Sequence, residues 1–337
     1  MHEQAVSDAA SAPRLAVRDL VVTYSVASGG LFSPRAAVRA VDGVTLTVGA
    51  GEVVALVGES GCGKTSLARA VAGLVAPSAG RVELDGADVT GFPAHLDSRL
   101  RAAIQMVFQD PFESLNPRKT VLATLTQPLR LNATVPPGER RAEAARLLAL
   151  AGLPPEALER YPHEFSGGQR QRIGIARAIA TRPRLLIADE AVSALDISIR
   201  AQLLALLGSL QKELALSMLF ITHDLAVVRS FADRVLVMYL GRIVEEGPTA
   251  AVFEQPAHPY TRALLAATPI PDPVAARATP REILGGDVPS PRDIPRGCRF
   301  HPRCPLAVAR CATEEPAHRL LPRAAGAAVA VSCHLAS

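Results

Sequence analysis

A glycine-rich segment, Gly58–Thr65 with the sequence GESGCGKT, combines the residue types that bind a polyphosphate. It follows an apolar run and precedes an amphipathic segment, so it fits a loop between a strand and a helix. Glycines let backbone N–H groups surround phosphates, and the amino terminus of the helix adds partial positive charge. We expect Lys64 to reach the β- and γ-phosphates and Thr65 to offer its hydroxyl to Mg²⁺. Cys62 occupies a free position of the motif and is interpreted as a small residue without chemistry of its own.

Two carboxylates, Asp189 and Glu190, end a second apolar run, Leu185–Ala188. Asp189 is placed to hold Mg²⁺ through water, and Glu190 is placed to polarise a water molecule aimed at the γ-phosphate. Acidic pairs after strands are also common as helix N-caps. The phosphate loop earlier in the chain favours the catalytic interpretation.

A third segment, FSGGQ at Phe165–Gln169, also presents backbone N–H groups to an anion, because two glycines follow a serine at the start of a helix. The helix continues through RQRIGIARAIATRP, with Ser166 expected at its cap. Two phosphate-reading helix termini are redundant within one chain.

Together these segments resemble the ATP-binding subunits of ABC transporters, over roughly residues 14 to 265. In that family the FSGGQ loop contacts the γ-phosphate of ATP bound by an opposite subunit, so two domains pair head to tail and one alone is a poor enzyme. The chain reproduces the order of the family's functional residues, which are Tyr24, Lys64, Gln109, Ser166, Glu190, Asp196 and His223. Ala191 departs from the proline usual after the catalytic glutamate, and we expect activity to survive this change.

The resemblance assigns a role to each matching position. It implies that ATP stacks on Tyr24, that Gln109 senses Mg²⁺ and the attacking water, and that His223 contacts the γ-phosphate. Outside the family, Tyr24 would be a strand-edge tyrosine and His223 a packing residue. The implied ATP-binding residues are Tyr24, Gly58, Glu59, Ser60, Gly61, Cys62, Gly63, Lys64, Thr65, Ser66, Gln109, Ser166, Gly167, Gly168, Gln169, Asp189 and Asp196. Thr65, Gln109 and Asp189 are implied around Mg²⁺, and Glu190, His223, Gln109 and Lys64 in catalysis.

Several longer stretches narrow the resemblance to the dipeptide/oligopeptide importer group, which also contains nickel importers. They are QDPFESLNPRKTV, YPHEFSGGQRQRIGIARAIA, GLFSPRAAVRAVDGV and HPYTRALL. The group implies ATP hydrolysis that powers peptide import with a second ATP-binding subunit, expected as a heterodimer, two transmembrane permease subunits and an extracytoplasmic binding protein. The chain would then lie peripherally at the cytoplasmic face of the plasma (inner) membrane. Open alternatives are a nickel or other small-solute importer, an exporter, and a non-transport ABC ATPase acting on DNA or ribosomes. A small-molecule kinase would not explain FSGGQ or the histidine.

Four cysteines near the carboxyl terminus form a separate candidate site: Cys298, Cys304, Cys311 and Cys333. Their spacing matches no paired zinc-knuckle pattern, yet clustered thiols in a chain without an export signal favour a soft metal over disulfides. The segment resembles the C-terminal region of the importer group, in which some members carry a four-iron four-sulfur cluster, and this resemblance makes such a cluster an expectation here. Zinc, with His301 and His334 nearby, and simple reduced thiols are the alternatives.

The elements that position these residues alternate between short apolar runs and helical patterns, which predicts an α/β fold with crossover helices. The resemblance specifies an ABC-type nucleotide-binding domain with a RecA-like core, an antiparallel β subdomain and a helical insertion. Expected strands are Arg14–Val22, Glu52–Val57, Arg81–Leu84, Ile104–Phe108, Arg184–Ala188, Ser217–Thr222, Arg234–Met238 and Arg242–Glu245. We expect the helical insertion at about 111–181, with a helix at Ala142–Ala151, and PIPDP at 269–273 as a linker. Residues 14–265 would form the ATP-binding domain and 266–337 a small cysteine-containing module.

Composition sets broader limits. With 337 residues, of which 49% are hydrophobic, the chain can bury a large core. Its first residues do not resemble a secretory signal, and no apolar run is long enough for a membrane span. The net charge of +4 is spread along the sequence, so a nucleic-acid partner is not expected.

Overall fold

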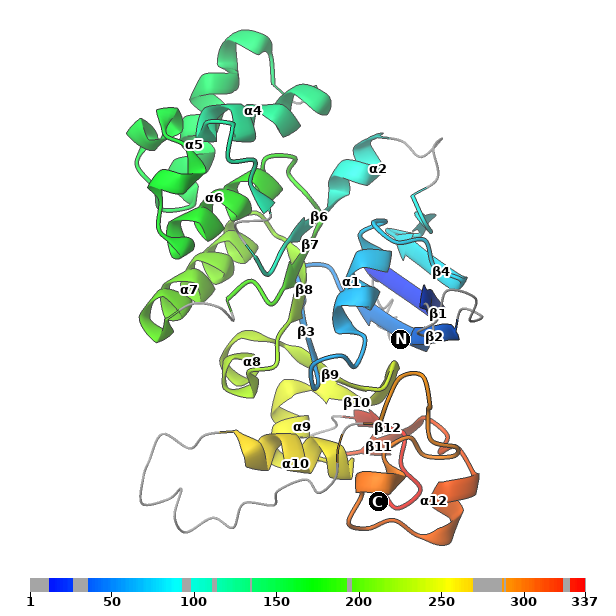
Figure 1. Ribbon diagram of the computed structural model, residues 1–337. Coiled ribbons are helices and arrows are strands. Elements are labelled where there is room, and N and C mark those ends of the chain that lie inside the picture. Colours follow the sequence, from blue (N-terminus) through cyan, green and yellow to red (C-terminus); the bar gives the residue numbers. More distant parts are fainter. Residues whose placement is uncertain are drawn as a thin grey trace, which may run out of the picture.

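An eight-stranded sheet forms the centre of the computed structural model, which describes residues 12–26, 36–92, 98–110, 114–133, 135–192, 196–268, 287, 289–323 and 328–336. The strand order is β11-β12-β10-β9-β3-β8-β7-β6 (Figure 1). The strands are β3 (Val53–Val57), β6 (Ile104–Val107), β7 (Leu185–Asp189), β8 (Ser217–Ile221), β9 (Arg234–Tyr239), β10 (Arg242–Pro248), β11 (Arg319–Pro322) and β12 (Ala328–Val331). Strands β9, β3, β8, β7 and β6 are parallel, and the pairs from β9 to β11 are antiparallel.

The parallel strands explain where the functional residues gather. Every residue of β3, β7 and β8 is buried, as expected for continuous apolar strands covered on both faces. Parallel strands place their carboxyl ends at one edge of a sheet, and ligands of open α/β sheets bind at that edge. The phosphate loop follows β3, Gln109 follows β6, Glu190 follows β7 and His223 follows β8.

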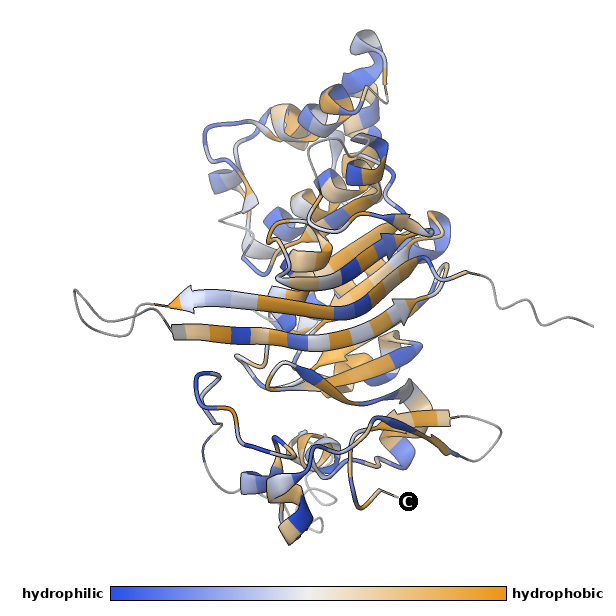
Figure 2. Ribbon diagram, turned by 90° about the vertical axis from the view of Figure 1, so that its right-hand side faces the viewer, coloured by the Kyte–Doolittle hydropathy of each residue, from blue (hydrophilic) through white to orange (hydrophobic). Residues whose placement is uncertain are grey.

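A smaller antiparallel sheet lies beside the first and has the order β2-β1-β4-β5. Its strands are β1 (Leu15–Val26), β2 (Ala36–Val48), β4 (Ala79–Leu84) and β5 (Ala87–Asp88), and the long β1 and β2 cross the face seen in Figure 2. Helix α1 (Lys64–Val71) lies between the two sheets and joins both in one apolar core. The sequence prediction missed β2, which overlaps a segment interpreted only as an insert.

The described residues between β6 and β7 form helices without strands. They are α4 (Val121–Leu131), η1 (Pro137–Glu139), α5 (Arg140–Leu150), η2 (Pro155–Glu159), η3 (Pro162–Glu164) and α6 (Gly167–Ile179). Helices α4, α5 and α6 share their own apolar core and stand at one end of the molecule (Figure 1). The remaining helical elements are α2 (Ser98–Ala103), α7 (Ile197–Glu213), α8 (Leu225–Phe231), α9 (Thr249–Glu254), α10 (Pro259–Ala267), η4 (His301–Arg303) and α12 (Ala309–Thr313).

The carboxyl-terminal residues do not form the separate module expected from the sequence. Strand β12 pairs with β10, with Val331 opposite Glu245, and β11 pairs with β12, so the tail extends the central sheet. Phe300 and Val329 are buried in one core with residues of β9, β10 and α10. The tail therefore packs as part of the main body, because an edge strand and an apolar surface of that body are available to it. The PIPDP segment lies outside the described residues.

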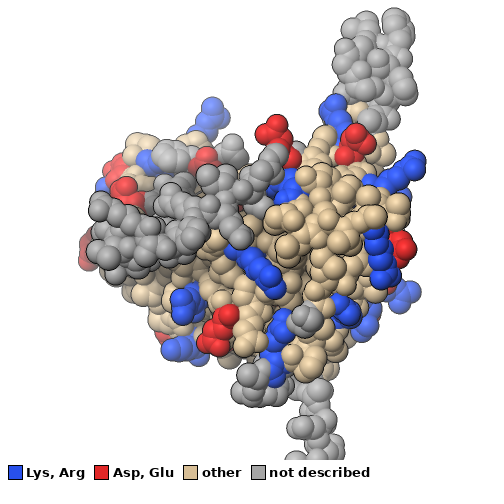
Figure 3. Space-filling model, turned by 90° about the horizontal axis from the view of Figure 1, so that it is seen from below, with Lys and Arg blue, Asp and Glu red and all other residues tan. Residues whose placement is uncertain are grey.

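Two surface properties bear on partners. In the view from the tail side, Lys and Arg side chains are dispersed among uncharged and acidic ones (Figure 3). Within the described ranges, the structure has no helix with the length and apolar character needed to cross a bilayer.

Candidate active site

Glycines determine the path of the phosphate loop between β3 and α1. The φ angle is 154° at Gly58 and 111° at Gly63, the residue before α1. A Cβ atom at Gly58 would lie 2.2 Å from the backbone oxygen of Met238, and one at Gly63 would lie 2.1 Å from that of Ala40. Any side chain there would have to displace neighbouring backbone, so this loop conformation requires glycine at both positions.

The ammonium group of Lys64 lies inside the loop. It donates hydrogen bonds to the carbonyl oxygens of Gly58, at 2.7 Å, and Glu59, at 3.0 Å, and the residue is 4% exposed. The sulfur of Cys62 lies 3.8 Å from the ammonium nitrogen, and burial raises the pKa of this thiol. The loop therefore surrounds one positive charge, with a neutral thiol beside it.

Thr65 and Asp189 place two oxygen-bearing side chains side by side. The Thr65 hydroxyl donates a hydrogen bond of 3.3 Å to Asp189 Oδ1. Burial raises the pKa of Asp189; the Thr65 hydrogen bond opposes this shift and the charge of Glu190 adds to it. A buried carboxylate beside a hydroxyl fits Mg²⁺, which prefers oxygen ligands and would supply the missing counter-charge.

Glu190, Gln109 and His223 meet although they follow three different strands. The amide nitrogen of Gln109 donates to Glu190 Oε2 at 3.0 Å, and Nδ1 of His223 lies 3.6 Å from Glu190 Oε1. The Glu190 backbone has a φ of 46°, and its N–H donates to the carbonyl oxygen of Ile221 at 3.0 Å. A left-handed backbone at a non-glycine residue is costly, and such strain concentrates at functional sites.

A cleft connects Thr65 and Asp189 with the helical region. Thr65, Gln109 and Asp189 line it, together with Arg69 and Arg177. The two arginines were not among the residues singled out from the sequence. Arg69 lies one helical turn after Thr65 on α1, so helical periodicity is the signal that would have found it. Arg177 comes to the cleft from α6, and only the packing of that helix places it there.

The FSGGQ segment forms the predicted helix start, at some distance from the phosphate loop. The Ser166 hydroxyl accepts a hydrogen bond from the Gln169 N–H, and the Gln169 side chain accepts one from the Ser166 N–H, so the two form a capping box. Ser166 is exposed, and α6 lies among the helices of the insertion (Figure 1), with Arg177 near its other end lining the cleft beside α1. The Gln171 amide donates to the carbonyl oxygen of Phe108, next to Gln109, at 3.2 Å. The structure thus connects α6 to the segment that carries Gln109, and it leaves the amino-terminal end of α6 exposed.

Two further residues predicted to bind ATP, Tyr24 and Asp196, lie close to segments outside the described residues. Tyr24 is half-buried on β1, opposite Val38 of β2, and packs against the core shared with α1. Asp196 is the residue before α7, and its carbonyl oxygen accepts a hydrogen bond from the Arg200 N–H at 2.9 Å. The three residues before Asp196, 193–195, lie outside the described residues.

The tail cysteines are all free thiols. The Cys298 N–H donates to the carbonyl oxygen of Cys311 at 2.8 Å, and burial, with smaller contributions from the other three tail thiols, raises the pKa of Cys298 to about 11. Within the described residues, which include these four cysteines, no group of three or more His, Cys, Asp or Glu side chains is arranged to hold a metal ion. The expected iron–sulfur cluster, and the zinc alternative, therefore have no support in the structure.

Comparison with known proteins places this site in a class. The family described as ABC transporter matches residues 41–193, and the family described as Oligopeptide/dipeptide transporter, C-terminal region, matches residues 244–311. The dimeric ATP-binding cassette MJ0796, in a post-hydrolysis state bound to ADP and Pi, superposes with a TM-score of 0.60 at 28% identity, over 70% of this chain and 98% of that one. The fold and site define an ABC ATPase, which hydrolyses ATP.

More similar relatives identify the family within this class. A probable peptide ABC transporter ATP-binding protein of Sinorhizobium fredii, y4tS, is 51% identical over 95% of this chain and 89% of its own length. The di/tripeptide transport ATP-binding protein DppF of Pseudomonas aeruginosa is 48% identical over 95% of this chain and 97% of its own length. Oligopeptide transport ATP-binding protein OppF of Salmonella typhimurium is 48% identical over 90% and 91%. The chain belongs to the family of ATP-binding proteins of peptide ABC transporters.

Proposed function

We propose that this chain is the ATP-hydrolysing subunit of an ABC importer that takes up peptides. The observation that carries the proposal is the contact of Glu190 with both Gln109 and His223, at the same sheet edge as the phosphate loop. The names of the relatives, which include di/tripeptide and oligopeptide transport proteins, support peptides as the cargo.

In the proposed mechanism, the loop amides and Lys64 hold the β- and γ-phosphates of ATP. Thr65 and Asp189 would hold Mg²⁺, which neutralises charge on the phosphates when it is bound. Glu190 orients a water molecule and withdraws its proton as the oxygen attacks the γ-phosphorus, and the bond to the β-phosphate oxygen breaks. Gln109 and His223 hold the Glu190 carboxylate in position through the contacts already described.

A second ATP-binding subunit completes the site in this proposal. The exposed Ser166 caps the amino-terminal end of α6, whereas it is Arg177, near the other end of that helix, that lines the cleft beside Thr65, so Ser166 is placed to serve another chain rather than the phosphate loop of its own. Head-to-tail pairing would bring Ser166, Gly167, Gly168 and Gln169 of each chain to the ATP of the other. The similar MJ0796 structure is described as dimeric, which supports such pairing. We propose a related but different ATP-binding subunit as the partner.

The remaining assembly follows from an importer of this family. Two transmembrane permease subunits and an extracytoplasmic binding protein would complete it, with this chain at the cytoplasmic face of the plasma (inner) membrane. The cleft beside Gln109 and the helices of the insertion would form the coupling surface for the permeases. Residues 14–265 would form the ATP-binding domain and 266–337 an extension of it.

An affinity purification from detergent-solubilised membranes tests the proposal. The tagged full-length chain would be isolated and its companions identified by mass spectrometry, with an untagged strain as control. Recovery of two polytopic proteins, a second ATPase and a binding protein supports an importer, and the ligand of that binding protein distinguishes peptides from nickel or another small solute. Recovery of ribosomal or DNA-repair proteins without polytopic partners would overturn the transport function while retaining the ATPase.

An iron–sulfur cluster on Cys298, Cys304, Cys311 and Cys333 is a separate proposal. It rests on the family resemblance alone, since no group of side chains in the described part of the chain is arranged to hold a metal ion. Visible absorption and iron analysis of protein purified without oxygen would test it. Folded protein that is colourless and free of iron would refute the cluster, and bound zinc would replace it.

A further inference from the structure

The tail of the chain contacts the phosphate loop directly. Arg303 of η4 donates two hydrogen bonds to the carboxylate of Glu59, from Nη1 to Oε2 at 2.7 Å and from Nη2 to Oε1 at 3.0 Å. The Arg303 side chain is only 5% exposed, and its hydrogen bonds to Glu59, aided by the charge of that carboxylate, raise its pKa. A two-pronged contact between a guanidinium and a carboxylate fixes orientation as well as distance.

A second residue from outside the nucleotide motifs holds the backbone of Glu59. The N–H of Glu59 donates to the hydroxyl of Tyr260 at 2.9 Å, and Tyr260, on α10, is fully buried. The carbonyl oxygen of the same Glu59 accepts the hydrogen bond from Lys64 and another from the Cys62 N–H, at 3.3 Å. Glu59 therefore joins Arg303 and Tyr260 on one side to Lys64 on the other.

An aromatic cluster makes this contact rigid. Phe300 is buried and its ring packs against those of Tyr239 and Tyr260, with centroid separations of 5.3 and 5.4 Å. Arg303 also donates to the Tyr239 hydroxyl at 3.4 Å. Since Phe300 and Arg303 are three residues apart in a helical turn, both face the main body, and burial of the ring places the guanidinium against Glu59.

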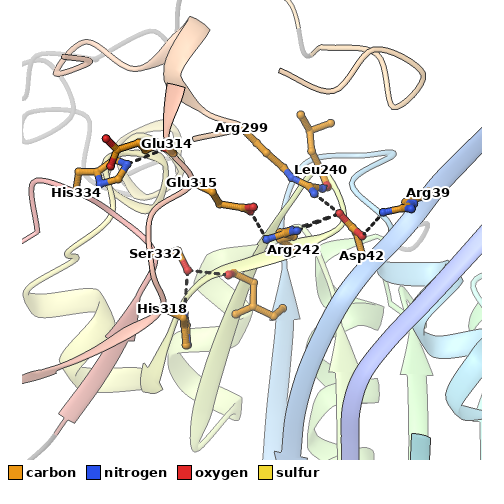
Figure 4. Close-up of polar contacts among 11 residues, drawn as sticks. Arg39, Asp42, Leu240, Arg242, Arg299, Glu314, Glu315, His318, Ser332 and His334 are labelled. Carbon is orange, nitrogen blue, oxygen red and sulfur yellow. Dashed lines mark hydrogen bonds and ion pairs between the residues drawn. The ribbon is translucent and has the colours of Figure 1, made fainter. Parts of the chain in front are cut away.

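The same tail segment reaches the other side of the loop through the β9–β10 turn. Arg299 contacts the Asp42 carboxylate and the carbonyl oxygen of Leu240, and Arg242 lies 3.3 Å from the same carboxylate (Figure 4). In that turn, the N–H of Gly241 donates to the carbonyl oxygen of Cys62 at 2.8 Å. The tail thus contacts the phosphate loop directly at Glu59, through Arg303, and indirectly at Cys62, through the turn that Arg299 contacts.

We propose that Arg303 and Tyr260 are positioning residues for ATP binding, and that the tail is in this way a structural part of the nucleotide site. They keep Glu59, and with it the carbonyl oxygen that orients Lys64, in the conformation that receives phosphate. A loop held in its binding conformation loses less conformational freedom on binding, so the contact strengthens affinity without touching the nucleotide. The proposal rests on the proposed function, because it requires that this loop binds ATP.

Nucleotide affinity of the full-length chain tests the proposal. We expect Arg303→Gln to weaken MgATP binding about tenfold, which corresponds to about 1.4 kcal/mol, in calorimetric titration. Glu59→Gln and Tyr260→Phe should weaken it in the same direction, and adding Glu59→Gln to Arg303→Gln should cost nothing more. Arg303→Lys should recover part of the affinity, since lysine keeps the positive charge but cannot make the two parallel hydrogen bonds of the guanidinium. Arg310→Gln, which removes an exposed ion pair of the same tail with Glu314, is the matched control and should bind as wild type.

Kinetics separate positioning from a merely structural role. In Arg303→Gln and Tyr260→Phe, the KM for ATP should rise with the dissociation constant, while kcat at saturating ATP should stay within about twofold, because these residues hold Glu59 whereas Glu190, held by Gln109 and His223, orients the attacking water. Wild-type affinity in folded Tyr260→Phe and Glu59→Gln proteins would overturn the proposal, even if Arg303→Gln does not fold. If the losses of MgATP affinity in Glu59→Gln and Arg303→Gln add in full in the double variant, the two residues act independently, and the proposal is also overturned. Wild-type protein without affinity for MgATP would instead refute the proposed function.

Discussion

Replacing Glu190 with glutamine tests the proposed chemistry with the least disturbance of the structure. The amide has the shape of the carboxylate, and its oxygen can still accept the 3.0 Å hydrogen bond from Gln109. The strained backbone of residue 190, with its N–H bonded to the carbonyl oxygen of Ile221, is unaffected by the change. Asp189 and Thr65 keep their mutual contact, so metal and nucleotide binding should persist.

The size of the effect follows from the role of the carboxylate. A positioned general base contributes roughly 10²- to 10⁴-fold to a rate, which corresponds to about 3 to 5 kcal/mol of transition-state stabilisation. An amide cannot accept the proton of the attacking water, so the variant should lose at least about a hundredfold in kcat. Affinity for MgATP should change little, and the ATP that is not hydrolysed should hold two ATP-binding subunits together.

Phosphate release and light scattering in the presence of MgATP measure the two consequences. Glu254→Gln, at an exposed glutamate that ends α9, is the control for removal of one negative charge and should hydrolyse ATP as wild type. If Glu190→Gln hydrolyses ATP at the wild-type rate, the assignment of Glu190 is wrong. If it neither binds ATP nor associates in its presence, the replacement has disturbed the site, and the argument that the contacts survive is wrong.

Three other predictions address the loop, the coupling surface and the tail. Gly63→Ala would place a Cβ atom 2.1 Å from a backbone oxygen, so calorimetric affinity for MgATP should fall by more than about tenfold; unchanged affinity would contradict the steric argument. Gln109→Ala should leave measurable ATP hydrolysis but reduce peptide uptake per ATP in reconstituted vesicles, and an unchanged ratio would remove Gln109 from the coupling surface. Burial raises the pKa of Asp42, but Arg299 and Arg242 together lower it more, so the pKa lies below the ordinary value of 3.8. A lowered carboxylate pKa stabilises the fold above that value and the stabilisation is lost as pH falls through the folded-state pKa. Asp42→Asn should therefore reduce the acid-side loss in melting temperature, and an unaltered pH profile would refute this.

Local sequence was sufficient for the elements whose physics is local. The phosphate loop was predictable because glycine, lysine and threonine at fixed spacing serve backbone geometry and phosphate charge within a few residues. The cap at Ser166 was predictable for the same reason, since its capping box with Gln169 spans one helical turn. The fully buried parallel strands, such as β7 and β8, were recognised because burial on both faces leaves apolar runs of four residues in each.

Elements that depend on a neighbour were missed. Strand β2 was not recognised, and it gains its identity from pairing with β1 along most of its length. Strands β11 and β12 have only four residues each, and they exist as strands because β10 offers an edge to β12, which in turn pairs with β11. A tail judged unable to build a core alone did not need one, because Phe300 enters the core of the main body.

The sequence by itself determined which residues are candidates for the chemistry, because the types and spacings that bind phosphate are dictated within single segments. Tertiary structure decided which of them touch. Gln109 and Glu190 meet only because β6 and β7 are parallel neighbours with their carboxyl ends at one edge. Arg303 and Glu59 are 244 residues apart, and no local pattern relates them. Their contact exists because burial of Phe300 places the guanidinium beside the phosphate loop, and side-chain burial is a property of the whole fold.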